Sequence, residues 1–303
     1  MEQFDTLIKA ALKEDLGAGD ATTEVFILEG QKFEGRMFAK CGGVLAGAGV
    51  AKRVFELADP GSRTRILLKD GTRFNKGAVI LTVRGSRRLL TAERTALNFI
   101  QHLSGVATRA ALFAKEIKNP RTKIYDTRKT IPGLRELEKR AVVCGGGANH
   151  RRGLYDAFLI KDNHIAMLGG SLERLRERLA YARKNYKGLK IEIEAQSLAQ
   201  VADFLPLGFD IIMLDNMGRA EMKQAIALIR VKSKKTEIEI SGGVRFEDLA
   251  ALSKLGADRI SVGSITNSAA ALDIAFDIWP VKNSRRGKRQ RLVKIKSCHP
   301  RNL

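Results

Sequence analysis

The sequence predicts an α/β protein in which a small α+β domain extends to about residue 110 and a β/α barrel follows it. After Pro120, short apolar segments alternate with amphipathic segments of helical spacing, and successive βα units of this kind form parallel sheets. Before residue 110, one amphipathic segment is followed instead by Gly-rich turns and short alternating segments. This change predicts a domain boundary.

The N-terminal part is predicted to begin with a helix over residues 3–16, because apolar residues recur there at helical spacing. Three short alternating segments predict strands, at residues 32–40, 64–74 and 78–86. A long helix is predicted to start within residues 91–98 and to run through residue 117.

Six apolar runs predict the strands of the barrel, at residues 123–126, 156–161, 189–194, 210–215, 236–241 and 258–263. Each interval has room for one helix, and three helices are well marked, at residues 171–185, 219–231 and 245–256. A seventh strand is expected around residues 140–144. This number of strands favours a barrel, and an open doubly wound sheet is the alternative.

The predicted domains are residues 1–110 joined by a helical region at 268–280, a barrel at 111–267, and a basic tail at 281–303. From residue 282 onward there are nine Lys or Arg residues and no acid. Subtracting these nine from the net charge of +21 leaves +12 for the rest of the chain. Such a balance fits nucleic acid, an anionic membrane surface or anionic small substrates. The cations within the motifs below favour small substrates, and the tail is expected to be a solvated extension.

The three cysteines, Cys41, Cys144 and Cys298, are far apart and form no paired metal or redox spacing. The longest run of small and apolar residues, 42–51, is far shorter than the roughly 20 residues that span a bilayer. The first residues lack the basic start and apolar centre of a secretory signal. We therefore expect a cytoplasmic protein with no membrane partner.

Polar residues or glycines close every predicted strand of the barrel. In β/α barrels the active site lies at the carboxyl ends of the strands, so these residues are expected to meet on one face. They are Arg128 and Lys129, Lys161, Glu194, Asp215, Ser241 with Gly242 and Gly243, and Gly263 with Ser264. A single such residue is more often a solvated strand end or a helix cap, but six converging positions predict a site.

Two loops, at residues 241–244 and 263–268, each follow a predicted strand and open a helix. Glycine lets the backbone approach a ligand closely, and free amides at a helix start favour an anion. The loops therefore predict a phosphate site, with an ordinary Gly-rich turn and Ser cap as the alternative.

The segment 126–164 is dense in cations that could surround a multiply charged anion, namely Arg128, Lys129, His150, Arg151 and Lys161. Arginine pairs with carboxylate or phosphate at two points, whereas lysine acts as a point charge. His150 lies in a Gly-rich loop and is expected to donate a hydrogen bond to the substrate. Cys144 is expected only to pack.

Nine segments, in the same order, resemble quinolinate phosphoribosyltransferases (nicotinate-nucleotide pyrophosphorylases, carboxylating) and extend to about residue 278. They are EDLGAGDATT, TAERTALNFIQHLSGVAT, DTRKTIPGLR, CGGGANHR, LIKDNHI, IEIEAQ, IMLDNM, EISGG and SVGSIT. The resemblance implies an N-terminal α/β sandwich and an incomplete seven-stranded barrel. It also implies a homodimer, with a hexamer of dimers as a larger alternative, in which one subunit closes the site of the other.

On the same resemblance, Arg94 would reach into the partner's site. The two carboxylates of quinolinate would be bound, with Thr127 nearby, by Arg128, His150, Arg151 and Lys161. Lys129 would face the pyrophosphate of phosphoribosyl pyrophosphate, and Glu194 and Asp215 would bind the ribose hydroxyls. These last three residues are the expected catalytic ones.

Mg²⁺ is the implied cofactor, held through phosphoribosyl pyrophosphate near Glu194 and Asp215 without direct protein ligands. The 5′-phosphate would be held by Ser241, Gly242, Gly243, Gly263, Ser264 and Asn267. The chain departs from the family where Asn267 replaces a usual histidine and where Gln196 replaces a common acidic residue.

The implied reaction joins the ring nitrogen of quinolinate to C1 of the ribose and releases pyrophosphate and CO₂, giving nicotinate mononucleotide for de novo NAD biosynthesis. Positioning and electrostatics supply the catalysis, so no enzyme nucleophile is needed. The alternatives are a related enzyme acting on nicotinate or another ring acid, a nucleic-acid-binding protein and an inactive relative. Aromatic residues, which single-stranded nucleic acids stack on, make up only 6% of the chain and are absent from the tail.

Overall fold

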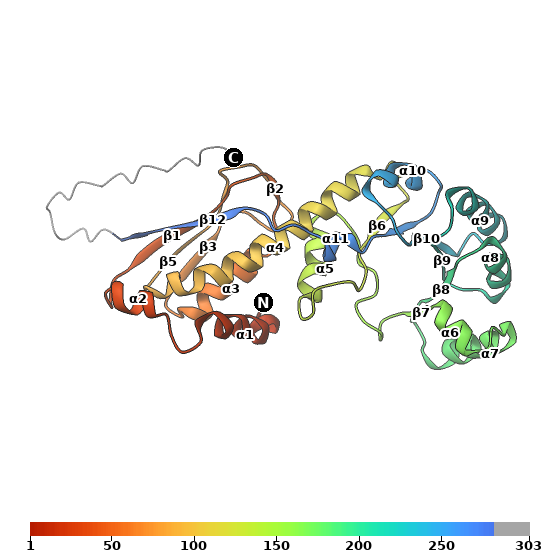
Figure 1. Ribbon diagram of the computed structural model, residues 1–303, viewed down its shortest axis with the longest axis horizontal. Helices are drawn as coiled ribbons and strands as arrows, with labels where there is room; N and C mark the ends of the chain where they lie inside the picture. Colours follow the sequence, from red (N-terminus) through yellow and green to blue (C-terminus); the bar gives the residue numbers. More distant parts are fainter. Residues whose placement is uncertain (282–303) are drawn as a thin grey trace, which may run out of the picture.

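The computed structural model describes residues 1–281, arranged as two parts that share the long helix α4 (Arg88–Glu116) (Figure 1). The N-terminal part contains α1 (Asp5–Leu16), α2 (Ala21–Phe26), α3 (Ala48–Ala58), β1 (Phe33–Ala39), β2 (Gly43–Val44), β3 (Arg63–Ile66), β4 (Arg73–Phe74) and β5 (Val79–Gly85). The predicted N-terminal helix, strands and long helix are all present. The basic tail from residue 282 lies outside the described residues.

A four-stranded antiparallel sheet of order β12-β1-β5-β3, with β12 at Ile274–Pro280, forms the N-terminal layer, and α3 and α4 pack against it (Figure 1). Residues on β1 alternate between buried and more exposed positions, as expected when one face of a sheet covers a core. Phe55 of α3 stacks on Phe276 of β12 with 5.4 Å between ring centroids, which joins the helix layer to the edge strand.

The segment 268–280 is not the expected helix, because residues Ile274–Pro280 form strand β12. This strand pairs antiparallel with β1 from Phe33↔Pro280 to Ala39↔Ile274. The physical reason is the spacing of its apolar residues: Ile274, Phe276 and Ile278 recur every second residue, which is the period of a strand.

The barrel part contains β6 (Lys123–Tyr125), α5 (Arg135–Cys144), β7 (Phe158–Ile160), α6 (Asp162–Met167), α7 (Leu172–Asn185), β8 (Ile191–Ala195), α8 (Leu198–Phe204), β9 (Ile211–Asp215), α9 (Arg219–Lys232), β10 (Glu237–Ser241), α10 (Leu249–Ser253), β11 (Arg259–Ser261) and α11 (Ser264–Asn267). All six predicted strands are present. They form one parallel sheet in the order β6-β11-β10-β9-β8-β7. This order is cyclic in sequence and opens only between β6 and β7, so the sheet is an incomplete barrel rather than a doubly wound sheet.

The seventh strand was expected at the wrong place. Residues 140–144 belong to helix α5, which buries Leu137 and Ala141, four residues apart, on one face. The additional strand position follows that helix and is reduced to a single parallel bridge between Tyr125 and Ala148. No helix in residues 1–281 is both long enough and apolar enough to cross a bilayer.

Candidate active site

The carboxyl ends of β7, β8 and β9 bring two acids and a lysine together. Lys161 follows β7, and its Nζ donates to Glu194 Oε1 on β8 at 2.5 Å. Asp215 closes the neighbouring strand β9 and accepts from Asn216 Nδ2 at 2.7 Å. Burial raises the pKa of Glu194, Lys161 opposes this, and the like charge of Asp215 raises the pKa further. Two carboxylates here are thus balanced by at least one cation.

Arg128 and Arg151 form the cationic side of the site, and both are partly buried. The pKa of Arg151 is lowered, first by burial and then by repulsion from Arg128, while Glu192 and Glu194 among others act in the opposite direction. Within residues 1–281, Arg128 Nε has no hydrogen-bond partner. Two neighbouring guanidinium groups with donors to spare suit a ligand that carries more than one carboxylate or phosphate group.

A fully buried ion pair between Lys139 Nζ and Asp126 Oδ1, at 2.6 Å, holds the loop that carries Arg151 in place. Lys139 also donates to the carbonyl of His150 at 3.0 Å, and Asp126 Oδ1 accepts the His150 amide at 2.8 Å. The side-chain amide of Asn149, oriented so that its nitrogen faces acceptors, donates to Asp126 Oδ2 at 2.8 Å. The backbone of residues 149–150 is therefore fixed by buried polar groups.

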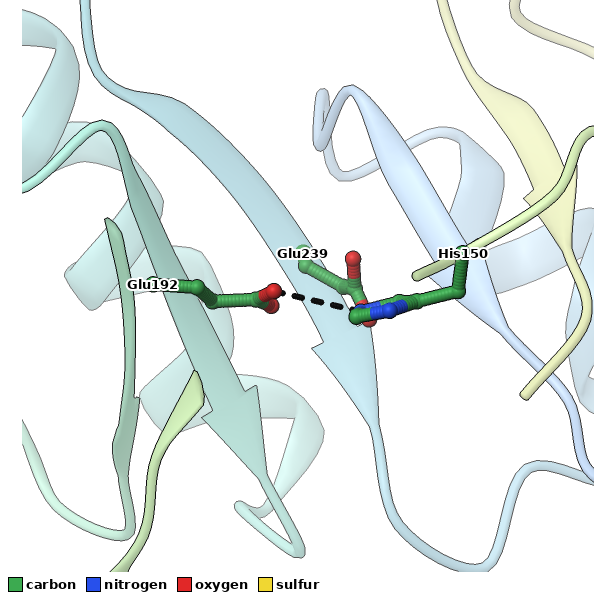
Figure 2. Close-up of side chains that lie close together, drawn as sticks. All are labelled: His150, Glu192 and Glu239. Atoms are coloured by element: carbon green, nitrogen blue, oxygen red, sulfur yellow. Dashed lines mark ion pairs between the residues drawn. The ribbon is translucent and has the colours of Figure 1, made fainter. Parts of the chain in front are cut away.

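The structure places His150 differently from the expectation that it binds substrate. Its Nε2 lies 3.1 Å from Glu192 Oε2 and 3.3 Å from Glu239 Oε1, within the barrel (Figure 2). Its Nδ1 accepts the amide of Arg151 at 2.8 Å. Both ring nitrogens thus face protein groups, although Nε2 forms no hydrogen bond within the described residues.

The protonation of this cluster follows from its geometry. Burial lowers the pKa of His150, but Glu192 and Glu239 raise it to about 10, which would charge the ring. A charged ring carries a proton on Nδ1 and could not accept the Arg151 amide. Because Nδ1 accepts the Arg151 amide, the ring proton is on Nε2. Burial and then the charge of Glu239 raise the pKa of Glu192.

The predicted phosphate loops lie at the ends of β10 and β11. Gly242 and Gly243 have φ angles of +83° and +57°, a backbone that other residues rarely adopt. A Cβ on Gly263 would lie 2.8 Å from the Lys129 side chain, so glycine there lets Lys129 lie against this loop. Among the described residues, the amides of Gly242, Gly243 and Gly263 donate to no protein group.

The other predicted phosphate residues surround these glycines. Ser241 ends β10, and Ser264 and Asn267 begin and end α11. Asn267 is exposed, and its Oδ1 accepts from Ser268 at 2.7 Å, which leaves its amide nitrogen available. The structure thus groups all six positions on two adjacent strand ends.

Of the remaining predicted residues, Arg94 lies apart from the site, and Thr127 makes a hydrogen bond within its own turn. Arg94 is exposed on α4 and makes no side-chain hydrogen bond or ion pair within residues 1–281, so it does not join the site of its own chain. Thr127 Oγ1 accepts the Lys129 amide at 3.0 Å and shapes the turn after β6.

Sequence reasoning missed three buried residues beneath the site, Lys139, Glu192 and Glu239. It also missed that Asp126 forms a buried ion pair with Lys139. The signal for the two glutamates was present, because IEIE and EIEI place acids at every second position of otherwise apolar strands. That period sends the glutamates to one face of each strand and the isoleucines to the other.

The fold and this site define a β/α-barrel enzyme that binds a multiply charged anion beside a phosphate. Family models of quinolinate phosphoribosyl transferase match the chain, the N-terminal domain over residues 20–104 and the C-terminal domain over residues 106–277. The chain therefore belongs to the quinolinate phosphoribosyltransferase family, as its motifs predicted.

Individual relatives agree with this assignment. The chain is 39% identical over 277 residues to a probable nicotinate-nucleotide pyrophosphorylase (carboxylating) of Bacillus subtilis, covering 91% of this chain and 93% of that protein. It is 36% identical to quinolinate phosphoribosyltransferase (decarboxylating) 1b of Nicotiana tabacum, covering 90% and 81%. The crystal structure of NadC from Streptococcus pyogenes is 41% identical, with a TM-score of 0.86 and coverage of 92% and 98%.

Proposed function

We propose that this protein is a quinolinate phosphoribosyltransferase that converts quinolinate and phosphoribosyl pyrophosphate to nicotinate mononucleotide, pyrophosphate and CO₂, in de novo NAD biosynthesis. The observation that carries the choice of substrate is the adjacency of Arg128 and Arg151, which repel each other. A dicarboxylate relieves this repulsion, and Lys161 adds a third cation at the neighbouring strand end. A ring acid with one carboxylate, such as nicotinate, would leave part of this charge unmatched.

The reaction proceeds with the ring nitrogen of quinolinate forming a bond to C1 of the ribose while the bond from C1 to pyrophosphate breaks. Positive charge develops on the sugar as the leaving group departs, and Glu194 and Asp215 lie on the side that would stabilise it. Lys129, beside Gly263, would take the negative charge of the pyrophosphate. The Arg pair holds the acid in place, so that the two reacting atoms meet in line.

Decarboxylation follows from the product of that step. The alkylated ring nitrogen withdraws electrons, so the carbon–carbon bond to the neighbouring carboxylate breaks, CO₂ leaves, and the electron pair remains on the ring carbon. That carbon then takes a proton, which gives nicotinate mononucleotide. The free amides of Gly242, Gly243 and Gly263 would hold the 5′-phosphate throughout.

Glu194 and Asp215 also fit the implied Mg²⁺. Carboxylate oxygens are donors that this ion prefers, and sites of this kind combine one or two carboxylates with substrate phosphates. When bound, the ion would neutralise the departing pyrophosphate. The chain's own part is to present the two acids at adjacent strand ends, with Lys161 balancing Glu194.

We further propose a homodimer in which Arg94 completes the partner's site, supported by its exposed position on α4 away from its own strand ends. Light scattering of the purified protein tests this: the mass of two chains is expected, and the mass of twelve chains would indicate a hexamer of dimers. A cytoplasmic location is supported by the free thiols of Cys41 and Cys144, which suit a reducing compartment.

The test combines purified protein with quinolinate, phosphoribosyl pyrophosphate and Mg²⁺, and follows nicotinate mononucleotide by chromatography. The proposal expects product that disappears when any one of the three is omitted. Product from nicotinate but not from quinolinate would establish the related enzyme instead, and no product from either acid would establish an inactive relative.

A further inference from the structure

A cluster of one histidine and two glutamates lies inside the barrel, beneath the strand-end residues. Glu192 is on β8, two residues before Glu194, and Glu239 is on β10, two residues before Ser241. Both carboxylates point at the His150 ring, from two strands that flank β9 (Figure 2). Their side chains are 2% and 0% exposed, so water does not solvate these charges.

This arrangement is costly for stability alone. Barrel interiors are ordinarily filled by branched apolar residues, and replacing a buried ionic cluster by apolar side chains is often neutral or stabilising. Ser261 Oγ donates to Glu239 Oε1 at 2.5 Å, and Arg259 approaches Glu239 Oε2 at 4.0 Å. Even so, Glu192 Oε1 and Glu239 Oε2 have no hydrogen-bond partner within the described residues. A contribution to stability therefore does not explain why these two buried positions hold glutamates.

A buried metal does not explain them either. The ligand atoms of the three residues lie within 4.8 Å of one another. A metal on Nε2 requires the other ring nitrogen to carry the proton and to donate it. Here Nδ1 accepts the Arg151 amide, so the proton is on Nε2, where the metal would have to bind.

The cluster has a direct connection to the substrate-binding cations. Its Nε2 lies within ion-pair distance of both glutamates without a hydrogen bond to either, and its Nδ1 accepts the backbone amide of Arg151. Glu192 is also the first of the negative charges that offset the repulsion of Arg151 by Arg128. The His150 ring thus lies between the glutamates of the barrel interior and the backbone of Arg151.

We propose that Glu192 and Glu239 are positioning residues for the dicarboxylate: they fix the His150 ring, which sets the backbone of Arg151 and so aims its guanidinium beside Arg128. This role deepens the proposed function and rests on it. Neither glutamate touches the substrate. Loss of either acid weakens binding of the acid substrate specifically, because only the arginine end of the site depends on the ring.

The test compares Glu192→Gln with Glu56→Gln, a control that removes the same charge from helix α3, where Glu56 pairs with Lys52 and Arg53 in the N-terminal part. Quinolinate affinity is measured by calorimetry, and KM for both substrates and kcat by steady-state kinetics. We expect Glu192→Gln to weaken quinolinate binding about 10- to 100-fold. KM for phosphoribosyl pyrophosphate and kcat should change far less, and Glu56→Gln should leave the affinity for quinolinate unchanged.

A double-mutant cycle shows whether the acid acts through the ring. His150→Asn retains an oxygen that can accept the Arg151 amide but withdraws from the glutamates, so Glu192→Gln should have no further effect on quinolinate affinity in that background. Additive losses would overturn the proposal, as would equal losses of affinity for both substrates. If Glu192→Gln does not fold by circular dichroism, Glu192→Asp, which keeps the charge but shortens its reach, takes its place in the cycle.

Two further results separate the alternatives. One equivalent of tightly held metal in dialysed protein, absent from Glu192→Gln, would overturn the positioning role in favour of a metal site. Wild-type protein that binds quinolinate but forms no product would contradict the proposed function while the binding cycle still decides this inference. Wild-type protein that does not bind quinolinate would contradict both.

Discussion

The two sheets of this protein differ in what they turn inward. The covered face of the N-terminal sheet carries Phe33, Met37, Leu81 and Val83, each at most 5% exposed. The barrel buries Glu192 and Glu239 to the same degree. The first sheet gains free energy from removing apolar area from water, at roughly 25 cal/mol per Å². The second must desolvate charges, which costs free energy unless each charge has partners.

This difference separates the stabilising region from the chemical one. The N-terminal sheet and its helices form a core whose composition explains its burial, whereas the buried ions of the barrel lie directly beneath the strand ends that carry the site. Substitutions confined to one region should therefore affect either stability or chemistry.

The largest effect is expected for Lys139→Met. The substitution leaves Asp126 buried without its cation, and removing one partner of a buried pair typically destabilises by about 3–5 kcal/mol. Chemical denaturation measures the loss, and the double variant Lys139→Met, Asp126→Asn should recover part of it. If the free energy of unfolding fell by less than is typical of an exposed ion pair, the Lys139–Asp126 pair would not be what holds the loop in place.

Arg128→Ala should act on binding rather than on folding. Truncating one side of a desolvated charge pair costs about 2–5 kcal/mol, so kcat/KM for quinolinate should fall roughly 30- to several-thousand-fold while the midpoint of unfolding barely changes. Steady-state kinetics and thermal melts of the same preparation provide the measurement. An unchanged KM for quinolinate would remove Arg128 from the site.

Two carboxyl groups in each region should have pKa values shifted in opposite directions from their ordinary values. Hydrogen bonds from Arg53 and from Thr23 lower the pKa of Asp5 and Asp20 respectively, so their contribution to stability is present above pH 3.8 and is lost as the pH falls through the lower folded value. Burial raises the pKa of Asp126 and Glu194, so these groups favour the fold below their ordinary pKa and lose that contribution as the pH rises through the higher folded value.

Carbon-13 NMR of the side-chain carboxyl groups checks this order. On acidification, Asp126 and Glu194 should take up protons before Asp5 and Asp20 do. Substitution of Asp215 by Asn should bring the titration of Glu194 to lower pH, because Asp215 raises its pKa. A reversed order would mean that the barrel acids are solvated.

The smallest effect is expected for Arg36→Ala in the N-terminal sheet. Arg36 pairs with Asp277 across β1 and β12 at 3.0 Å, but both side chains are nearly half exposed. Exposed pairs of this kind contribute about 0–1 kcal/mol, so stability and kcat/KM should both remain near wild type. Denaturation and kinetics together check this, and a large loss of activity would show that the N-terminal sheet also takes part in the reaction.

The strands and most helices of the barrel could be predicted because each is a continuous apolar run or an amphipathic repeat. Residues 268–280 show the limit of that reasoning, since the strand period of Ile274, Phe276 and Ile278 outweighed an expected helix. For the site, the charged residues at strand ends were found because barrel geometry makes those ends converge. The direction of His150 could not be predicted, because it depends on the loop that Asp126 and Lys139 hold and on acids from two distant strands.

The most direct measurement of the central claim uses quinolinate labelled in the carboxylate next to the ring nitrogen, mixed with phosphoribosyl pyrophosphate and Mg²⁺. The account predicts labelled CO₂ released in a one-to-one ratio with nicotinate mononucleotide. Nucleotide formed without release of label, or from nicotinate alone, would contradict it.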